Sequence, residues 1–299
     1  SVVDGEYGVT DNTIMVKINS SLHMDYFWRQ LEAKRLNSMV FGSGQPLITG
    51  SQIKSLVIPL PPTKAEQEAI AEALSDADAL IESLEQLITK KRHLKQGAMQ
   101  ELLTGKKRLP GFSGEWEVKR LGDVADPNQK WSFTGGPFGS NLKSSDYIDD
   151  GVRIIQLQNI GDGEFYNDSV VFTSFAKANE LLSCNIYPGE IILSKMGDPV
   201  TRACIIAPHH ERYLMCSDGI RLAVNPKSFD TYFVYISINA PDFRTRAENA
   251  GTGSTRKRIG LTELRNLEIL CPELLEQTAI ADILSDMDTE LAALETKLV

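Results

Sequence analysis

The sequence EQEAIAEALSDADALIESLE, residues 66–85, returns 210 positions later as EQTAIADILSDMDTELAALE, residues 276–295. Eleven of the twenty positions are identical. A weaker repeat lies upstream, where Tyr26-Phe27 matches Tyr232-Phe233 at an offset of 206. The sequence therefore indicates a repeated unit, in which a globular domain is followed by a helix. The first domain is represented only by its last third, so we expect the chain to be part of a longer two-unit protein.

The first copy of the repeat has the pattern of one long helix. Thr63 and Glu66, which follow two prolines, form a capping box, in which each side chain bonds the other residue's backbone amide. Gly105 ends the helical pattern, and Pro110 prevents it from resuming. The segment between these signals has about 42 residues, or roughly 60 Å at 1.5 Å per residue. Such a helix is too long to be an ordinary core element.

Apolar residues recur in steps of four and three in both helices, which is the 3.5-residue period of a coiled coil. The two stripes are Ile70, Leu74, Ala77, Ile81, Leu84 and Ile88, and Ile280, Leu284, Met287, Leu291, Leu294 and Leu298. We expect the stripes to pair antiparallel, because each helix then sets its acidic first half beside the basic second half of its mate. The pair would act as a ruler between its ends. In the alternative interpretation, each stripe packs on its own globular domain.

Charge is distributed unevenly along the chain. The whole sequence has a net charge of −9, but residues 63–88 and residues 273–299 each carry −6, so the remainder is +3. Basic residues cluster at 90–95, 106–108 and 244–258. This separation is compatible with DNA binding at the globular ends, although ordinary solvated faces explain it equally well. No run of eighteen apolar residues and no signal peptide occurs, so we expect a cytoplasmic protein.

Residues 115–272 alternate short apolar runs with turn-forming residues, which predicts a mixed domain. We expect strands at 152–157, 189–193, 203–206 and 220–224, and helices at 175–182 and 231–238. The predicted fold class is α+β, with mixed-sheet domains joined by long helices that form an antiparallel coiled coil. The expected organisation is part of a first domain (1–62), a long helix (63–105), a linker (106–114), a second domain (115–272) and the start of a second helix (273–299).

The motifs of common enzymes are missing from this sequence. It contains no phosphate-binding loop, no dinucleotide-binding glycine pattern, no zinc-protease helix, no nucleophile elbow and no adenine-methyltransferase tetrapeptide. His209-His210 follows Pro208 and is expected to form a turn. The four cysteines have no C-x-x-C spacing and are expected to be reduced thiols. We therefore predict no catalytic residue, no metal and no cofactor.

Loops of the second domain place hydrogen-bonding side chains near positive charge. Glutamine and asparagine suit adenine, arginine suits guanine, and hydroxyls and lysines suit phosphates. Each loop alone is weak evidence, since a glycine-rich turn is usually only a turn. The predicted DNA-binding residues are Lys143, Ser144, Gln156, Gln158, Asn159, Lys195, Arg202, Thr252, Ser254, Thr255, Arg256, Lys257 and Arg258.

Several segments carry a more specific resemblance. The run from Leu94 to Phe112, followed by Trp116, resembles the central conserved region of specificity subunits of type I restriction–modification systems. The helix start after Pro61, repeated after Pro272, resembles that family's helix-start signature. Three further segments resemble its target-recognition domains: residues 136–143, 158–160 and 188–194.

This resemblance implies a non-catalytic subunit with two target-recognition domains at opposite ends of an antiparallel coiled coil. Each domain would recognise half of a split double-stranded DNA target, and the helices would set the spacing. The implied partners are two methyltransferase subunits, which supply the S-adenosylmethionine chemistry, and ATP-dependent restriction subunits. Two alternatives remain: a recognition-module fragment of a fused methyltransferase–nuclease, or a coiled-coil adaptor that binds no DNA.

Overall fold

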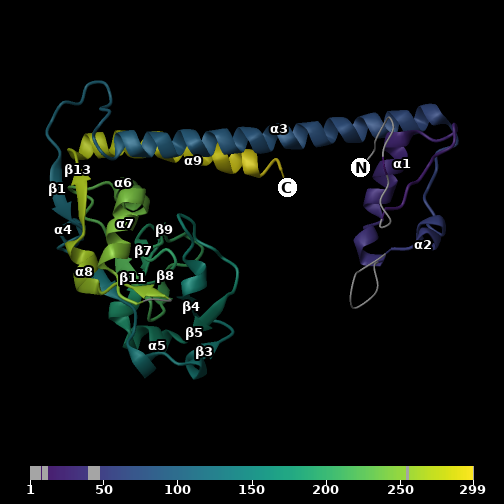
Figure 1. Ribbon diagram of the computed structural model, residues 1–299. Coiled ribbons are helices and arrows are strands. Elements are labelled where there is room, and N and C mark those ends of the chain that lie inside the picture. Colours follow the sequence, from purple (N-terminus) through teal and green to yellow (C-terminus); the bar gives the residue numbers. More distant parts are fainter. Residues whose placement is uncertain (1–7, 9–12, 40–47, 254–255, 299) are drawn as a thin grey trace. The chain divides into compact units, whose positions relative to one another are not determined.

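The computed structural model describes residues 8, 13–39, 48–253 and 256–298. The chain divides into two compact units, residues 1–88 with 298–299 (unit one) and residues 89–297 (unit two). One helix, α3 (Lys64–Leu102), begins in unit one and ends in unit two (Figure 1). In the described part of the chain, no helix combines the length and the apolar character needed to cross a bilayer.

The regular secondary structure described in unit one consists of helices. It contains α1 (Met24–Ala33), the short 3-10 helix η1 (Leu36–Met39), α2 (Gly50–Lys54) and the first part of α3. The backbone N–H of Glu66 donates to the Thr63 hydroxyl at 3.2 Å, which caps α3 as the sequence predicts. Tyr26 is buried, and its hydroxyl donates to the Pro59 carbonyl at 2.9 Å.

One buried amide ties the start of α3 to the segment that precedes α1. The Gln67 side chain is almost fully buried, and its Oε1 accepts from the His23 N–H at 2.8 Å. Its Nε2 donates to the carbonyls of Ser21 and Pro61 at 3.3 and 3.2 Å. All polar atoms of this side chain are therefore satisfied inside unit one.

Unit two contains a five-stranded sheet in the order β3-β5-β4-β10-β6. Its strands are β3 (Tyr147–Ile148), β5 (Val171–Thr173), β4 (Val152–Ile155), β10 (Tyr213–Met215) and β6 (Asn185–Ile186). Only β4 and β10 pair in parallel. All four residues of β4 are buried, since one hydrophobic cluster covers Val152 and Ile154 and another covers Ile155.

A four-stranded antiparallel sheet lies next to it in the order β2-β11-β7-β9. Its strands are β2 (Phe133–Gly135), β11 (Gly219–Leu222), β7 (Ile191–Ser194) and β9 (Ala203–Ile205). Two short ribbons complete the strands: β1 (Glu117–Arg120) with β13 (Glu268–Cys271), and β8 (Met196–Gly197) with β12 (Lys257–Arg258). The sheets and helices together confirm the predicted α+β class.

The helices of unit two pack mainly around the four-stranded sheet. They are α4 (Leu121–Val124), α5 (Phe175–Glu180), α6 (Thr231–Asn239), α7 (Pro241–Ala250), α8 (Leu261–Asn266) and α9 (Leu274–Glu295). Short 3-10 helices are η2 (Gly139–Asn141), η3 (Ser144–Asp146), η4 (Leu157–Asn159) and η5 (Leu182–Cys184). The largest hydrophobic cluster joins Leu222 of β11 with Phe233 of α6, Leu284 of α9 and Leu102 of α3.

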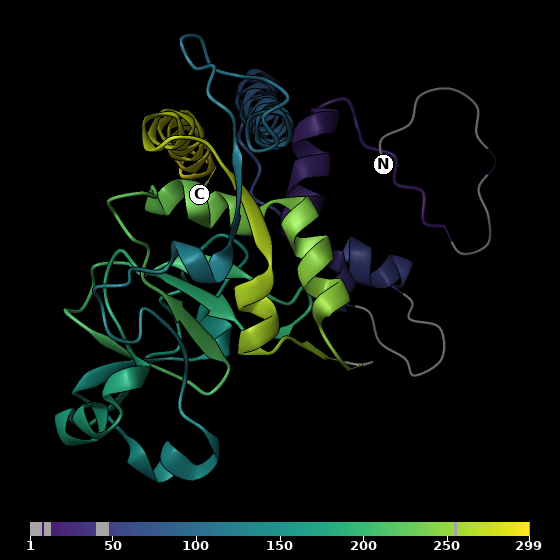
Figure 2. The same ribbon diagram turned by 90° about the vertical axis from the view of Figure 1, so that its left-hand side faces the viewer.

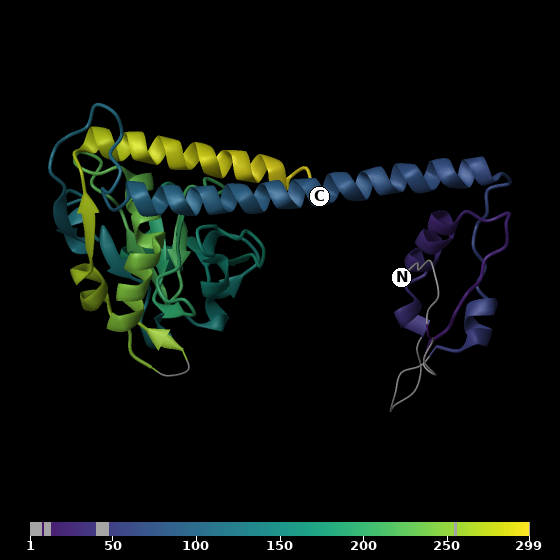
Figure 3. The same cartoon turned by 45° about the horizontal axis from the view of Figure 1, so that its top comes forward.

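Within unit two, α9 runs antiparallel to the last part of α3 (Figures 1 and 3). Figure 2, in which the helices are seen nearly end-on, shows them side by side. Four ion pairs join the two segments: Lys91–Glu290 at 2.7 Å, Arg92–Glu295 at 2.6 Å, Lys95–Asp288, and Arg108–Glu276 at 2.7 Å, the last just beyond the end of α3. The pairs from 91–95 to 288–295 and from 108 to 276 fit the antiparallel direction. Acidic residues of α9 therefore meet basic residues of α3, as the charge pattern predicts.

The predicted register of this pair is wrong. The predicted pairing opposes Ile70–Ile88 to Ile280–Leu298, but residues 91–108 face 276–295. Ile280 and Leu284 also pack into the domain core with α6, so the alternative interpretation holds in part. In the first stripe, Leu74 and Ile81 are 42% and 46% exposed. A 3.5-residue period specifies a narrow apolar face but does not specify what covers it.

Candidate nucleic-acid interface

Several strand ends of unit two meet at one edge. The Cys216 N–H donates to the Ile155 carbonyl at 2.9 Å, so the turn after β10 lies beside the end of β4 and its successor Gln156. In the same turn, the Asp218 carbonyl accepts from the Lys195 N–H at 2.6 Å, which brings in the end of β7. We call this region the strand-end edge. It consists of Phe138, Gln156, Lys195, residues 216–218 and the β8–β12 ribbon.

The end of β2 joins the same edge through a close backbone contact. The Gly136 N–H donates to the Gly219 carbonyl at 2.8 Å. A Cβ atom on Gly136 would lie 1.7 Å from the Cys216 carbonyl oxygen, so only glycine fits here. Two residues later, the Phe138 side chain is 79% exposed, and the Lys195 ammonium lies 5.8 Å from its ring centroid.

The β8–β12 ribbon adds cations to this edge. The Ile259 N–H donates to the Lys195 carbonyl at 3.0 Å, which fixes β12 next to the end of β7. On β12, the Arg258 guanidinium pairs with Asp218 at 2.7 Å, and the Lys257 ammonium donates to the Glu248 carbonyl at 3.1 Å. Both side chains are exposed, as is Arg256 before them.

Arg202 and Thr252 also lie next to the ribbon. The Arg202 carbonyl accepts from the Ser194 N–H at 2.8 Å, and the half-buried side chain lies beside Gly197 of β8. Thr252 is exposed and exchanges backbone hydrogen bonds with Arg258 at 2.9 and 2.8 Å. Ser254 and Thr255, which were predicted to bind DNA, lie outside the described residues.

The predicted amide side chains separate into two kinds. Gln156 is half-buried and Gln158 is exposed, and the Gln158 Nε2 donates to the Gln156 Oε1 at 3.1 Å and also to the Ser169 hydroxyl. These two amides and Ser169 form a chain of polar groups beside the strand-end edge.

Asn159 is a correction to the predicted set. It is fully buried, and its Oδ1 accepts from the Gln156 N–H at 2.8 Å. Its Nδ2 donates to the carbonyls of Tyr166 and Asp168 at 3.0 and 2.8 Å. With both amide hydrogens used inside the domain, Asn159 shapes the loop after β4 and is not available to a ligand.

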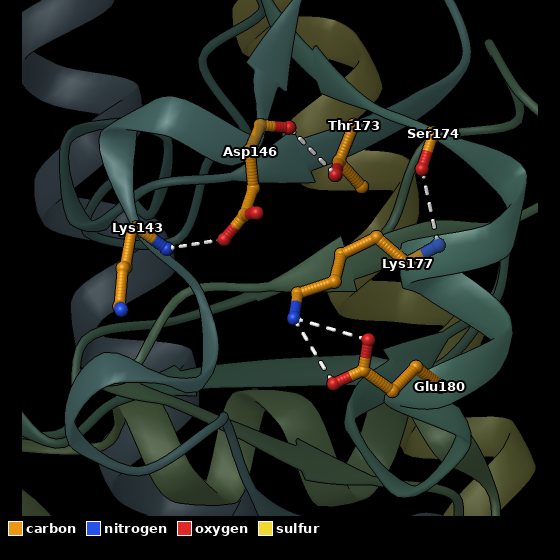
Figure 4. A network of polar contacts seen from close by, with 6 residues as sticks. All are labelled: Lys143, Asp146, Thr173, Ser174, Lys177 and Glu180. Carbon is orange, nitrogen blue, oxygen red and sulfur yellow. Dashed lines mark hydrogen bonds and ion pairs between the residues drawn. The ribbon is translucent and has the colours of Figure 1, made fainter.

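Lys143 and Ser144 lie at the opposite end of the five-stranded sheet. They precede β3, which pairs with β5 at Thr173, the residue opposite the first residue of β4. Figure 4 shows the network there: the Lys143 N–H donates to the Asp146 carboxylate at 2.7 Å, and the Thr173 hydroxyl donates to the Asp146 carbonyl at 2.8 Å. The structure therefore does not bring Lys143 and Ser144 to the strand-end edge.

The thiols near the strand-end edge have raised pKa values. All four cysteines are free. Burial raises the pKa of the Cys216 thiol at the strand-end edge, and burial raises that of Cys204 on β9 to about 12. Both groups are neutral thiols at physiological pH. Among the described residues, no group of three His, Cys, Asp or Glu is arranged to hold a metal ion. The edge offers amides, cations and one aromatic ring, which is the chemistry of binding.

One prominent member of this edge, Phe138, was not among the predicted DNA-binding residues. It lies in the segment 136–143, which resembles part of a target-recognition domain. The available signal was an aromatic residue between glycines, directly before a basic and hydroxyl-rich stretch.

Comparison with known proteins agrees with this architecture. Residues 4–90 and 113–298 match the family model described as "Type I restriction modification DNA specificity domain". Two curated relatives come from Methanocaldococcus jannaschii. The type I restriction enzyme MjaVIII specificity subunit is 25% identical over 95% of this chain and 68% of its own length. The putative type I restriction enzyme MjaX specificity subunit is 30% identical over 82% of this chain and 55% of its own length.

Solved structures show the same fold. The HsdS subunit from Thermoanaerobacter tengcongensis gives a TM-score of 0.52 at 21% identity, covering 92% of this chain and 62% of that one. The S subunit of a type I restriction–modification system from M. genitalium gives 0.62 at 19% identity, with coverages of 93% and 69%. The present chain therefore spans from about half to about two thirds of the length of these proteins. Since the family model matches most of its residues, the chain belongs to the type I restriction–modification DNA specificity domain family.

Proposed function

We propose that this chain is a non-catalytic DNA sequence-specificity subunit of a type I restriction–modification complex. In this proposal, the strand-end edge of unit two recognises one half of a bipartite target. The observation that carries the proposal is the convergence of Gln156, Lys195 and Arg258 at one edge through backbone hydrogen bonds. Amides and guanidinium groups suit base edges, and ammonium groups suit phosphates.

The contact residues have different roles in this proposal. Arg256 and Lys257 are exposed on the ribbon and are assigned to the DNA backbone. Gln156 and Gln158 are assigned to base edges, because their amides are adjacent and oriented by each other. Lys143 and Ser144 are left out of the contact set, since they lie at the other end of β4.

The helices are assigned to spacing and assembly. We propose that α3 and α9 set the distance between half-sites and dock two methyltransferase subunits, to which restriction subunits add. In this proposal, the exposed apolar residues of the first stripe bind a further helix. That helix would carry basic residues, as the last part of α3 does where it meets α9. Support comes from the family and from a neighbouring solved structure that concerns complex assembly of a type I R-M system. A complex of this kind would act in the cytoplasm.

The test is DNA binding by the chain assembled with its methyltransferase subunits. The wild-type complex is expected to bind random-sequence duplex at low salt and a selected duplex more tightly. Arg256→Ala or Lys257→Ala should weaken both and reduce the salt slope by about 1. Gln156→Ala or Gln158→Ala should change the selected sequence and leave the salt slope unchanged.

Lys143→Ala is the matched control, because it removes an exposed lysine from the opposite end of the sheet. It is expected to leave affinity and salt slope unchanged. A wild-type complex without affinity for either duplex would identify a coiled-coil adaptor and refute the proposal. Unchanged binding by all four edge variants would refute the assignment of the edge.

A further inference from the structure

Phe138 is an exposed aromatic residue mounted on the strand-end edge. It lies in the loop between β2 and η2, and 79% of it is exposed. Leaving a phenyl ring in water forgoes the free energy that its burial would supply. No hydrophobic cluster of the described residues includes this ring.

The ring is held in place from both sides of the loop. Gly136 is fixed against the turn at Cys216, and the Asn141 N–H donates to the Phe138 carbonyl at 3.1 Å. The Lys195 ammonium lies over the ring at 5.8 Å, close enough for a cation–π interaction. An exposed ring on a fixed loop loses little conformational freedom when it contacts a ligand.

Phe175 is a suitable comparison, because its ring is also exposed beside a cation but lies away from the strand-end edge. It is 63% exposed, and the Arg212 guanidinium lies 5.7 Å from its ring centroid. Phe175 begins α5, directly after β5, at the opposite end of the sheet from Gln156. The two phenylalanines thus share their chemistry and differ in whether candidate DNA contacts surround them.

We propose that the Phe138 ring enters a groove of the bound duplex and contacts the apolar surface of the bases, while Lys195 beside it meets a neighbouring phosphate. This inference rests on the proposed DNA function and adds a contact that is neither a hydrogen bond nor a charge. Phenylalanine can contact a thymine methyl group, or it can insert between base pairs as a wedge. Both modes remove the ring from water.

The experiment compares Phe138→Ala with Phe175→Ala in the complex assembled with the methyltransferase subunits. The probe is a duplex selected from a random pool by the wild-type complex. Phe138→Ala is expected to weaken binding about tenfold to a hundredfold, the range for loss of one aromatic contact to a base. The salt slope should stay at the wild-type value, because no charge is removed. Phe175→Ala should bind like wild type.

Base analogues then identify the contact. Replacing thymine by uracil removes the methyl group, and 2-aminopurine becomes more fluorescent when its stacking is broken. One of these effects should appear with the wild-type complex and disappear with Phe138→Ala. Weakened binding with neither effect would show that the ring acts only through the shape of its loop, which overturns the inference.

The outcomes distinguish a failure of this inference from a failure of the proposed DNA-binding function on which it rests. If the wild-type complex binds the selected duplex and Phe138→Ala binds it equally well, only the role of Phe138 is refuted. If the wild-type complex binds no DNA, the proposed function itself fails. Phe138 is exposed, so its truncation should leave the thermal unfolding of unit two unchanged and keep the comparison interpretable.

Discussion

The start of α3 in unit one and the start of α9 in unit two are joined to their domains in the same way. In unit two, the Gln277 Oε1 accepts from the Asp230 N–H at 3.0 Å, and its Nε2 donates to the carbonyls of Ser228 and Pro272 at 3.2 and 2.8 Å. Gln67 makes the corresponding three bonds in unit one. The repeated glutamine is therefore a joint between helix and domain, used once in each unit.

The acidic residues beside the two joints have different surroundings. In unit two, Glu276 is 2% exposed and pairs with Arg108, and Asp288 accepts from Tyr232 and pairs with Lys95. In unit one, Glu66, the counterpart of Glu276, is exposed. Asp78, the counterpart of Asp288, is also exposed and pairs with Arg29 at 2.6 Å. The joint thus recurs in both units, because each glutamine binds backbone groups of the segment that precedes α1 or α6. In contrast, Glu276 is buried against Arg108, whereas Asp78 stays exposed.

The largest expected difference lies between the repeated leucines. Leu284 is fully buried in the core of unit two, whereas Leu74 is 42% exposed. Leu284→Ala should lower the free energy of unfolding of unit two by about 2–5 kcal/mol through the cavity it leaves. Leu74→Ala should change stability by less than about 0.5 kcal/mol. Hydrogen exchange of α9 and of the first part of α3 measures both. Equal losses of stability from the two substitutions would contradict the difference in burial between Leu284 and Leu74.

The two joints should respond alike. Gln277→Ala leaves the Asp230 N–H and the carbonyls of Ser228 and Pro272 without their side-chain partner, at a cost of about 1–3 kcal/mol. Gln67→Ala should cost a similar amount in unit one. Gln86→Ala is the control, since that amide is exposed and bonds the exposed Glu82 side chain at 3.3 Å. Urea unfolding followed by hydrogen exchange compares the three. If either alanine variant were as stable as the wild type, that glutamine would not hold its helix to the domain.

The repeated glutamates should differ. Glu276→Gln removes the charge that receives two hydrogen bonds from Arg108, so the melting temperature of unit two should fall by several degrees. Glu66→Gln alters an exposed side chain and should leave thermal unfolding unchanged. Calorimetry of the two variants tests this. An equal loss from Glu66→Gln would mean that exposure does not separate the two acidic faces.

The smallest expected effect is a loss of folding stability at alkaline pH. Burial, together with the neighbouring Asp288 carboxylate, raises the pKa of Tyr232. The folded state therefore keeps its phenol proton after the unfolded chain loses it, and stability falls as pH rises above about 10. Tyr232→Phe should make this fall shallower, as measured by urea midpoints on either side of that pH. An unchanged slope would contradict the assignment.

The sequence predicted the elements that carry a long or strong local pattern. The capped, periodic helix α3 and the apolar runs of β4, β7, β9 and β11 lie within about three residues of the predicted segments. The ribbon strands β8 and β12 have two residues each, too short for any period to show. These strands form because Lys195 and Ile259, which are far apart in the sequence, are in contact in the folded domain.

The candidate site was predictable by residue type but not by position. Gln156 and Asn159 are both amides after a strand, yet a 3-10 turn directs Asn159 into the domain, where backbone carbonyls bind it. Lys143 and Lys195 are both loop lysines, yet the contacts of β7 hold Lys195 at the strand-end edge, while strand pairing places Lys143 at the other end of the five-stranded sheet. The registers that decide these outcomes involve residues far apart in the chain.

The frame of the strand-end edge is made of main-chain hydrogen bonds. The contacts of Cys216 with Ile155, of Gly136 with Gly219 and of Lys195 with Asp218 involve no side-chain donor or acceptor. Side chains at positions 138, 156 and 195 can therefore be exchanged without breaking any of these bonds. Under the proposed function, point substitutions at such positions would change target preference on a scaffold that stays as it is.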